Sequence, residues 1–531
     1  MEEGIPKPPP PPPPRSCTDE AWIKQVCRKV NSSRPVDHPG NPCTIFRVPG
    51  HIRRLDPEAY EPMVTCFGPF HYAYPYSSYV MQDHKWRCVG HLLSRHGGEE
   101  LQNRLLGKCL SEMKKQDDKI RSCYSGELPP SLDAQNLASM MLLDGCFIIH
   151  LMLKMWQKGM EDETTEEDEG KKKGEWKIEL GEDGTVLSMR KGDEQLEIPY
   201  EAGQSTFNIV VYDVLKLENQ IPFFVIQLLF HHLKSPKDGE VNLVDLALHL
   251  FKDIHPQKSK SFQKGLPDDY HHLLHLFYSS RTPSIKERAK TPGWIRRAIE
   301  CKGKLPKKGP KWKELEVALP STPKWTPNAM ELDRVGVKFK RNEWADSFLN
   351  IKFKQRGLRI APLLCLLRLC LMFKSGWMEI PPLQIYGYTS HLLRNLMAFE
   401  QCYPKTEMYI MTYISFMDGI INQAEDVRLL RLEGILQHKL SNDKAAAELF
   451  NKLGSQIQFD WKSNYLEKEI TEVIYRVDKF YEFKWHEWLA GLRRDYFGNP
   501  WTIISVLAAT AILLLTVEQA IFSTMSYFRS S

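Results

Sequence analysis

The sequence lacks the short motifs that mark the common enzyme sites. It has no Gly-x-Gly-x-x-Gly and no P-loop to hold phosphate groups, and no Gly-x-Ser-x-Gly elbow for a nucleophilic serine. It has no Cys-x-x-Cys pair, which argues against a zinc ribbon or a dithiol redox site. We therefore predict no catalytic residue, no cofactor and no metal ion.

A disulfide pattern and a secretory signal are also missing. The N-terminus has two acids and the proline run 8–14 where a signal peptide needs an apolar core, so we expect synthesis in the cytosol. The scattered spacing of the 12 cysteines is typical of a reducing compartment. These are Cys17, Cys27, Cys43, Cys66, Cys88, Cys109, Cys123, Cys146, Cys301, Cys365, Cys370 and Cys402.

Long apolar runs are rare, and the clearest one lies at the C-terminus. Residues 502–517 carry no charge, and residues 519–528 extend the run past its single acid, Glu518. About 20 mostly apolar residues are enough to cross a bilayer, and Pro500 suits the first turn of a helix. This pattern predicts a membrane anchor rather than a buried core helix. Its membrane-facing residues would be Trp501, Ile503, Ile504, Val506, Leu507, Ala508, Ala509, Ile512, Leu513, Leu514, Leu515 and Val517.

The charges beside this run predict its orientation. Arg493 and Arg494 precede the run, whereas Arg529 follows it. Because positive residues favour the cytosolic side, we expect a single-pass, tail-anchored protein with most of the chain in the cytosol. The ionised Glu518 would cost about 2.5–3.5 kcal/mol near the bilayer centre. Neither the plasma membrane nor an endomembrane is indicated.

The remaining chain has mainly helical periodicity. The predicted helices span residues 19–30, 136–156, 210–233, 386–403, 409–421, 427–438, 443–453 and 460–496. Residues 136–156 resemble a second membrane span, but Asp144, His150 and Lys154 favour a buried helix. Strand alternation is confined to a hairpin within 176–198 and to 335–340. The predicted fold class is mainly α: a large multi-helix body, a small β-hairpin insertion and one C-terminal transmembrane helix.

Composition divides the chain into three parts. We predict a Pro-rich extension with a short amphipathic helix (1–41), a helical domain (42–495), and the anchor with a short tail (496–531). The domain carries an acidic insertion at 157–204 and a basic, Pro-rich insertion at 284–325. The excess of Lys and Arg in residues 286–313 is typical of a solvated loop, and the alternative is a surface that binds anionic lipid or nucleic acid. No nucleic-acid-binding motif surrounds them, so nucleic acid is not favoured.

Two groups of residues resemble sites. His271 and His275 have the spacing of one helix face, next to His272, but the Glu of a His-Glu-x-x-His motif is missing. The second group consists of isolated acids in apolar surroundings, which are catalytic in some proteins and hydrogen-bonded within helical bundles in more. These acids are Asp144, Glu218, Glu400 and Asp426.

Ordered sequence motifs run along most of the chain. The most specific of them is the segment from Asp213 to Val225, which contains LENQIPFF. The other motifs, in order, are FRVP (46–49), YEP (60–62), FGPFH (67–71), KW (85–86), MLLDGCFI (141–148), HLL (272–274), GVKF (336–339), RNLMAFEQ (394–401), FMD (416–418), Asp426-Val427, Gly434-Ile435, Tyr496-Phe497 and Pro500-Trp501. Together these motifs resemble one plant family, known as domain of unknown function 247.

These motifs have an architectural character. We expect the amides of Asn219 and Gln220 to bond backbone groups at a helix junction, with Pro222 directing the following helix. We expect Arg394 and Glu400 to form structural ion pairs and not to take part in catalysis. The predicted structural residues of the family motifs are Asp144, Glu218, Asn219, Gln220, Pro222, Arg394, Asn395, Glu400, Asp418 and Pro500.

The resemblance implies a membrane-associated plant protein with no established enzymatic activity. Some grass members of the family are implicated in self-incompatibility recognition, and another member resembles a sex-determination factor. The expected function is therefore recognition or scaffolding, with the lipid bilayer and an unidentified protein as partners and homo-oligomerisation left open. The alternatives are an enzyme using Asp144, Glu218 or the His271–His275 group, and a binder of anionic lipid or nucleic acid through the basic loop.

Overall fold

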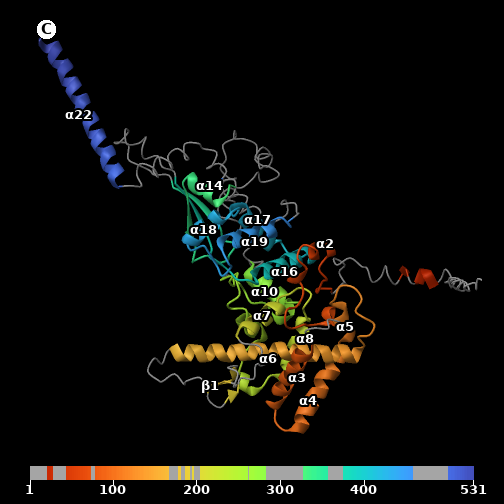
Figure 1. Cartoon of the computed structure of the whole chain (residues 1–531). Coiled ribbons are helices and arrows are strands. Elements are labelled where there is room, and N and C mark those ends of the chain that lie inside the picture. The colour runs from red at the N-terminus through yellow and green to blue at the C-terminus, as the bar shows by residue number, and fades with distance from the viewer. Residues whose placement is uncertain are drawn as a thin grey trace, which may run out of the picture.

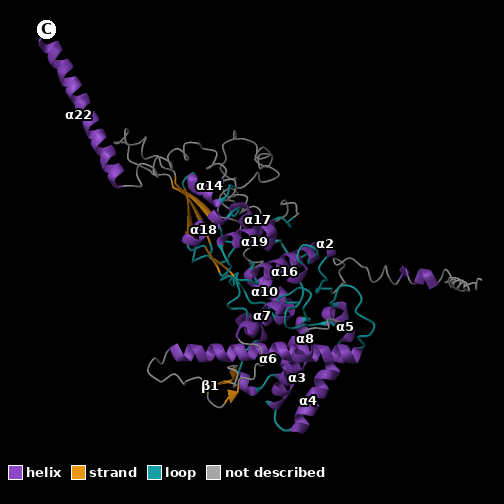
Figure 2. Cartoon of the chain, viewed as in Figure 1, coloured by secondary structure: helices purple, strands orange, loops and turns teal. Residues whose placement is uncertain are grey.

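The computed structural model describes residues 21–24, 26–27, 43–72, 78–166, 177–180, 186–191, 194–195, 204–260, 262–282, 327–356, 375–457, 477 and 500–530. The predicted domain boundaries, the basic insertion and almost all of the predicted helix at 460–496 lie outside these residues. Within them the fold is mainly α, as predicted. Figure 2 shows small groups of strands among the helices.

The first half of the described chain is built from short and medium helices around one long helix. The helices are α2 (Gly50–Arg53), α3 (Ser78–Ser94), α4 (Glu99–Lys115), α5 (Asp117–Ser122), α6 (Ala134–Glu166), α7 (Gln204–Val214), α8 (Phe223–Leu233), α9 (Leu243–Leu250) and α10 (Leu273–Arg281). The 3-10 turns are η1 (Pro57–Ala59), η2 (Pro69–His71), η3 (Pro236–Asp238) and η4 (Pro267–Asp269).

Helix α6 is the central packing element of this half. It contacts α3, α4, α8 and α9, and Figure 1 shows it lying across one end of the body. Its most apolar stretch, Ala134–Gly159, has a mean hydropathy of 1.6 and is 78% buried. The prediction of a buried helix rather than a membrane span is therefore confirmed. The helix also continues to Glu166, so the start of the predicted acidic insertion is helical.

The second half contains α14 (Ala329–Arg334), α16 (Thr389–Cys402), α17 (Tyr409–Ile420), α18 (Ala424–Leu432) and α19 (Asp443–Gly454). The predictions at 386–403, 409–421 and 443–453 are confirmed. The prediction of one helix at 427–438 is wrong at its C-terminal end, because Gly434 has a positive φ of 69° and ends the helix. The following residues form β8 (Leu436–His438). Likewise, 210–233 is two helices, α7 and α8, separated by the loop 215–222.

Within the described residues, the strands form three small sheets. As predicted, β1 (Lys177–Leu180) and β2 (Val186–Lys191) pair as a hairpin, and β2 also pairs with β3 (Glu194–Gln195). The second sheet has the order β4 (Val337–Arg341), β6 (Ser375–Ile380), β5 (Lys352–Arg356), and the third pairs β7 (Leu383–Ile385) with β8. Strand β4 confirms the prediction at 335–340, whereas β5 to β8 were not predicted.

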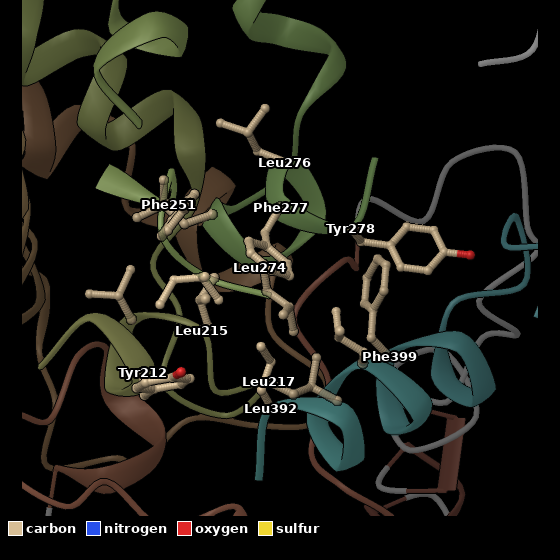
Figure 3. Close-up of a cluster of buried hydrophobic side chains, with 14 of the residues drawn as sticks. Tyr212, Leu215, Leu217, Phe251, Leu274, Leu276, Phe277, Tyr278, Leu392 and Phe399 are labelled. Atoms are coloured by element: carbon tan, nitrogen blue, oxygen red, sulfur yellow. The ribbon is translucent and has the colours of Figure 1, made fainter. Parts of the chain in front are cut away.

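A continuous apolar core joins the two halves. Figure 3 shows Leu215 and Leu217 from the loop 215–222 pointing toward side chains of α10 and α16. Phe399 of α16 contacts Tyr278 of α10, with ring centroids 5.4 Å apart. The loop 215–222 therefore lies where elements from both halves meet.

Helix α22 (Pro500–Ser530) differs from all of these helices in its exposure. It begins at Pro500, as predicted, and Figure 1 shows it standing apart from the body. Its stretch Ala508–Ser526 has a mean hydropathy of 1.5 but is 0% buried. By length and composition this helix is a candidate to cross a membrane. The two long apolar helices thus have nearly equal hydropathy, and burial separates them.

Candidate functional site

The loop 215–222 carries a set of buried polar side chains that complete the end of α7. Asn219 Nδ2 donates to the Asp213 carbonyl over 2.9 Å. Gln220 Nε2 donates to the carbonyls of Val214 and Lys216, each over 2.7 Å. The last carbonyls of a helix have no partner within it, and these amides supply one. Pro222 then precedes α8 with φ −58°, so the predicted roles of Asn219, Gln220 and Pro222 are in agreement with this geometry.

The same loop region binds the N-terminal segment, defined as residues 43–72. The buried carboxylate of Asp213 accepts three backbone hydrogen bonds, from Met63 (2.9 Å), Val64 (2.7 Å) and Thr65 (3.0 Å). Asn219 Oδ1 accepts from the Phe67 amide over 2.6 Å. One acid and one amide thus hold four backbone amides of this segment, which water would otherwise solvate.

A buried cation lies beside Asp213. Lys216 Nζ is 3.7 Å from Asp213 Oδ1 and donates to the Glu61 carbonyl of the N-terminal segment. Burial raises the pKa of Asp213, and Lys216 and the three amides oppose this shift without cancelling it. Burial also lowers the pKa of Lys216. A buried charge needs a partner and hydrogen bonds to be tolerated, and this pair has both.

Asp144 of α6 holds the N-terminal segment from the other side. Its Oδ2 accepts from the Gly68 amide over 2.7 Å, and its Oδ1 lies 2.5 Å from Lys85 Nζ of α3. Lys85 also donates to the Cys66 carbonyl over 2.6 Å. Asp144, one of the acids considered for catalysis, is thus surrounded by backbone and by Lys85.

Helix α16 completes the binding of this segment. Asn395 Nδ2 donates to the Ala59 carbonyl over 2.8 Å, and its Oδ1 accepts from the Leu217 amide over 2.9 Å. Arg394 Nε lies 2.8 Å from Asp56 Oδ2. Asn395 therefore bridges the N-terminal segment and the loop 215–222, and Arg394 forms a structural ion pair of the kind expected.

The other predicted acids have local roles. Glu400 accepts from the amides of Ile410 and Met411 and from the Tyr278 hydroxyl, with the expected cationic partner replaced by these neutral donors. Burial raises the pKa of Glu400 to about 7. Asp426 accepts from three backbone amides at the start of α14 and α18. Half-buried Asp418 of α17 has a pKa raised by burial to about 6.

The histidine group does not have the predicted arrangement. Helix α10 begins at Leu273, so His271 lies before the helix and does not share a helix face with His275. His272 caps the helix by accepting from the His275 amide, and the rings of His271 and His275 stack 4.8 Å apart. His271 Nε2 is 2.8 Å from the Tyr403 hydroxyl. Within the described chain, no group of three or more metal-binding side chains has the geometry to hold an ion.

Glu218 has the surroundings most like those of a ligand site. It lines a cavity of about 250 Å³, accepts from the Val48 amide over 2.6 Å and forms an ion pair with Arg53. Nε2 of His71 is 3.9 Å from Glu218 Oε2. Burial lowers the pKa of His71 to about 4, although Glu218 opposes that shift, so the imidazole is neutral near pH 7. The complete lining is Arg47, Val48, Arg53, Glu61, Phe70, His71 and Glu218.

This cavity is a candidate site for small molecules. It presents the neutral imidazole of His71 beside the Glu218–Arg53 ion pair, while the Arg47 guanidinium covers the Phe70 ring at 4.3 Å. The residues lining it include no serine, threonine or cysteine to act as a nucleophile. Arg53 and His71 were missed as site residues because they lie far along the chain from Glu218; the only sequence signal was the occurrence of His71 in the FGPFH motif.

Comparison with known proteins finds relatives that cover most of this chain. The family model described as "Plant protein of unknown function", DUF247, matches residues 45–515. A UPF0481 protein of Arabidopsis thaliana is 29% identical over 490 residues, which cover 91% of this chain and 87% of that protein. A putative UPF0481 protein of the same plant is 22% identical over 536 residues, with 92% of each chain covered. No solved structure matches the chain. The chain therefore belongs to the DUF247 family of plant proteins.

Proposed function

We propose that this chain is a membrane-anchored, non-enzymatic recognition or scaffold protein, held in the bilayer by α22, whose helical body binds another protein. The observation that carries this proposal is the exposure of α22. Large apolar side chains, including Leu513, Leu514 and Phe522, are more than half exposed along it. Each such side chain gains about 1.5–3 kcal/mol when it leaves water, so the helix requires an apolar environment.

The polar groups of α22 also suit a bilayer. The hydroxyls of Ser505, Thr516 and Thr524 donate to backbone carbonyls one turn earlier, over 2.9, 2.7 and 2.7 Å. Such bonds satisfy these three hydroxyls in a solvent that cannot hydrogen-bond. Glu518 is the group of α22 that is costly to place in the bilayer, and the apolar side chains of the helix must offset that cost.

The arrangement of the buried acids supports the non-enzymatic part of the proposal. Asp144, Asp213 and Glu400 direct their oxygens at backbone amides and neighbouring side chains. These groups support the fold of the body. The positive residues Arg493 and Arg494 before α22 favour a cytosolic body, and the recognition role follows from the family resemblance, including its self-incompatibility members.

Alkaline carbonate extraction of plant membranes tests the anchor. The wild-type chain should stay in the membrane pellet, and Leu513→Arg/Leu514→Arg should become extractable, because each arginine costs roughly 2.5–3.5 kcal/mol at a helix centre. The matched control is Leu266→Arg/Leu432→Arg, which makes the same change at exposed leucines of the body and should remain in the pellet. Extraction of the wild-type chain, or retention of the α22 variant, would contradict the proposal.

A second candidate function, small-molecule binding or catalysis, is favoured by the Glu218 cavity alone. Native mass spectrometry of the full chain purified from plant tissue tests it. A bound small molecule that disappears in His71→Phe would support this candidate. A mass equal to that of the bare polypeptide, for the wild-type chain as for the variant, would favour the scaffold proposal.

A further inference from the structure

The sheet formed by β4, β6 and β5 has one apolar and one basic face. Val337, Phe339, Phe353, Met378 and Ile380 are buried on the apolar face. Side chains alternate between the two faces of a strand, so the residues between them point outward. We call these outward residues the lysine face: Lys338, Lys340, Lys352, Lys354, Trp377 and Glu379.

The strand register arranges the lysine face in two rows. In the first row, Lys338 and Lys354 lie on either side of Trp377. In the second, Lys340 and Lys352 lie on either side of Glu379. The lysines therefore occupy both edge strands, and the ring and the acid occupy the central strand. The result is a flat basic surface with an aromatic ring in it.

Nearby acids offset only part of this charge. Lys338 Nζ is 2.8 Å from Asp333 Oδ1, and Lys354 Nζ is 2.7 Å from Glu379 Oε1. Lys340 Nζ lies 4.3 Å from the centroid of the Trp377 ring. All of these lysines are exposed, and exposed ion pairs contribute little. The face therefore keeps an excess of positive charge available to a partner.

An exposed tryptophan lies in the connection that follows β4. Trp344 follows β4 in the connection to β5, and its side chain is 85% exposed. Lys260 Nζ lies 5.8 Å from its ring centroid. Tryptophan and lysine together are typical of protein surfaces at the interface between lipid and water.

Packing places this sheet in the part of the body that leads toward α22. Helix α19, the last element before α22 whose bounds lie within the described residues, packs on α18; α18 packs on α14, and α14 packs on β4. In the view of Figure 1, α14 stands at the end of the body nearer α22. A membrane that holds α22 would therefore be within reach of the sheet.

We propose that the lysine face and Trp344 lie against the headgroups of an anionic phospholipid membrane. This inference rests on the proposed anchoring by α22 and adds a second contact that sets how the body sits on the bilayer. Positive side chains near an anionic leaflet gain attraction that falls with salt. A tryptophan among them can enter the interface.

Headgroup quenching in reconstituted vesicles tests the proposal with the full chain. A fluorescent amino acid replaces Trp344, and in a control protein it replaces Trp86, an exposed residue of α3. Vesicles contain phosphatidylcholine alone or mixed with phosphatidylserine, together with a headgroup spin-labelled lipid as quencher. We expect strong quenching at position 344 in the anionic vesicles, several-fold weaker quenching in neutral vesicles or high salt, and little quenching at position 86.

Charge variants identify the surface responsible. Reversal of Lys338, Lys340, Lys352 and Lys354 to Glu should abolish the phosphatidylserine-dependent quenching, and their replacement by Gln, a milder change for folding, should remove most of it. The matched control reverses Arg104, Lys108, Lys114 and Lys115 of α4 and should leave quenching at 344 unchanged.

The outcomes separate this inference from the proposed function. Vesicle incorporation without quenching at 344, or quenching that ignores phosphatidylserine and the sheet lysines, would overturn the inference and leave the anchor intact. Failure of the wild-type chain to associate with either kind of vesicle would overturn both.

Discussion

At the scale of single residues, Gly68 shows how closely the N-terminal segment approaches the loop 215–222. Its φ is +67°, and a Cβ built on it would lie 2.5 Å from the Gln220 carbonyl oxygen. Both the backbone conformation and the available space therefore require glycine, since side chains other than hydrogen are disfavoured at positive φ. The contact partner is backbone, which cannot rotate away.

Gly68→Ala should therefore destabilise the protein by roughly 1–3 kcal/mol. The matched control is Gly107→Ala in α4, where nothing lies within 4 Å of the added Cβ. That change should be neutral or stabilise by up to about 1 kcal/mol, because alanine favours a helix interior. Denaturant unfolding of the full-length variants in detergent measures both effects. Equal stability of the two variants would contradict the close approach at Gly68.

Glu400 gives the protein a pH dependence with a defined sign. Burial raises its pKa to about 7 from an ordinary value of 4.5. Between pH 4.5 and 7 the folded protein therefore holds a proton that the unfolded chain releases, so raising the pH favours unfolding. At 1.36 kcal/mol for each pKa unit, the lost stability amounts to at most roughly 3 kcal/mol.

Glu400→Gln should remove this contribution. The difference in unfolding free energy between wild type and variant should shift in favour of the variant as the pH rises from 5 to about 7.5. Unfolding curves at several pH values measure this difference in unfolding free energy. The other titrating groups contribute equally to both proteins and therefore drop out of it. A difference that stays constant with pH would show that Glu400 keeps the same charge in both states.

At the scale of elements, buried acids hold segments through three backbone amides at a time. Asp213 does so for residues 63–65, and Asp426 does so for Met330, Asn422 and Gln423. Removing the acid leaves these buried and part-buried amides without their hydrogen-bond partner, at about 1–3 kcal/mol for each group that stays shielded from water. Each acid should therefore control the local opening of a different segment.

Asp213→Ala should accelerate hydrogen exchange at the amides of residues 63–65 and leave those of Met330 and Asn422 protected. Asp426→Ala should have the reverse effect, so each variant serves as the control for the other. Hydrogen exchange read out by mass spectrometry separates the two segments. Uniform acceleration in both variants would mean that the acids stabilise the fold globally instead of holding these segments.

The same scale shows what the sequence could predict. Helices α16, α17 and α19 and the β1–β2 hairpin follow from periodicity, and Asp144, His150 and Lys154 correctly marked α6 as buried. Strands β5 to β8 were missed because strands of 3 to 6 residues are too short to give a clear alternation of apolar and polar residues. The amide roles of Asn219 and Gln220 were predictable because their partners are local. The cavity was not, because Arg53 and His71 meet Glu218 only through the fold.

At the scale of the whole molecule, a body held together by buried polar contacts is followed by a helix with no buried face. The described body buries most of its apolar side chains in one core, whereas none of the stretch Ala508–Ser526 is buried. We propose that α22 lies in a bilayer and that the body lies outside it, on the cytosolic side. The charges flanking α22 are the basis for that orientation.

Protease protection of intact plant membrane vesicles tests this account most directly, with one epitope placed ahead of Pro8 and another after Ser531. We predict that protease removes the N-terminal epitope while the C-terminal epitope is protected, and that detergent exposes both. Protection of the N-terminal epitope in intact vesicles would contradict the cytosolic placement of the body. Digestion of both epitopes without detergent would contradict the transmembrane anchor itself.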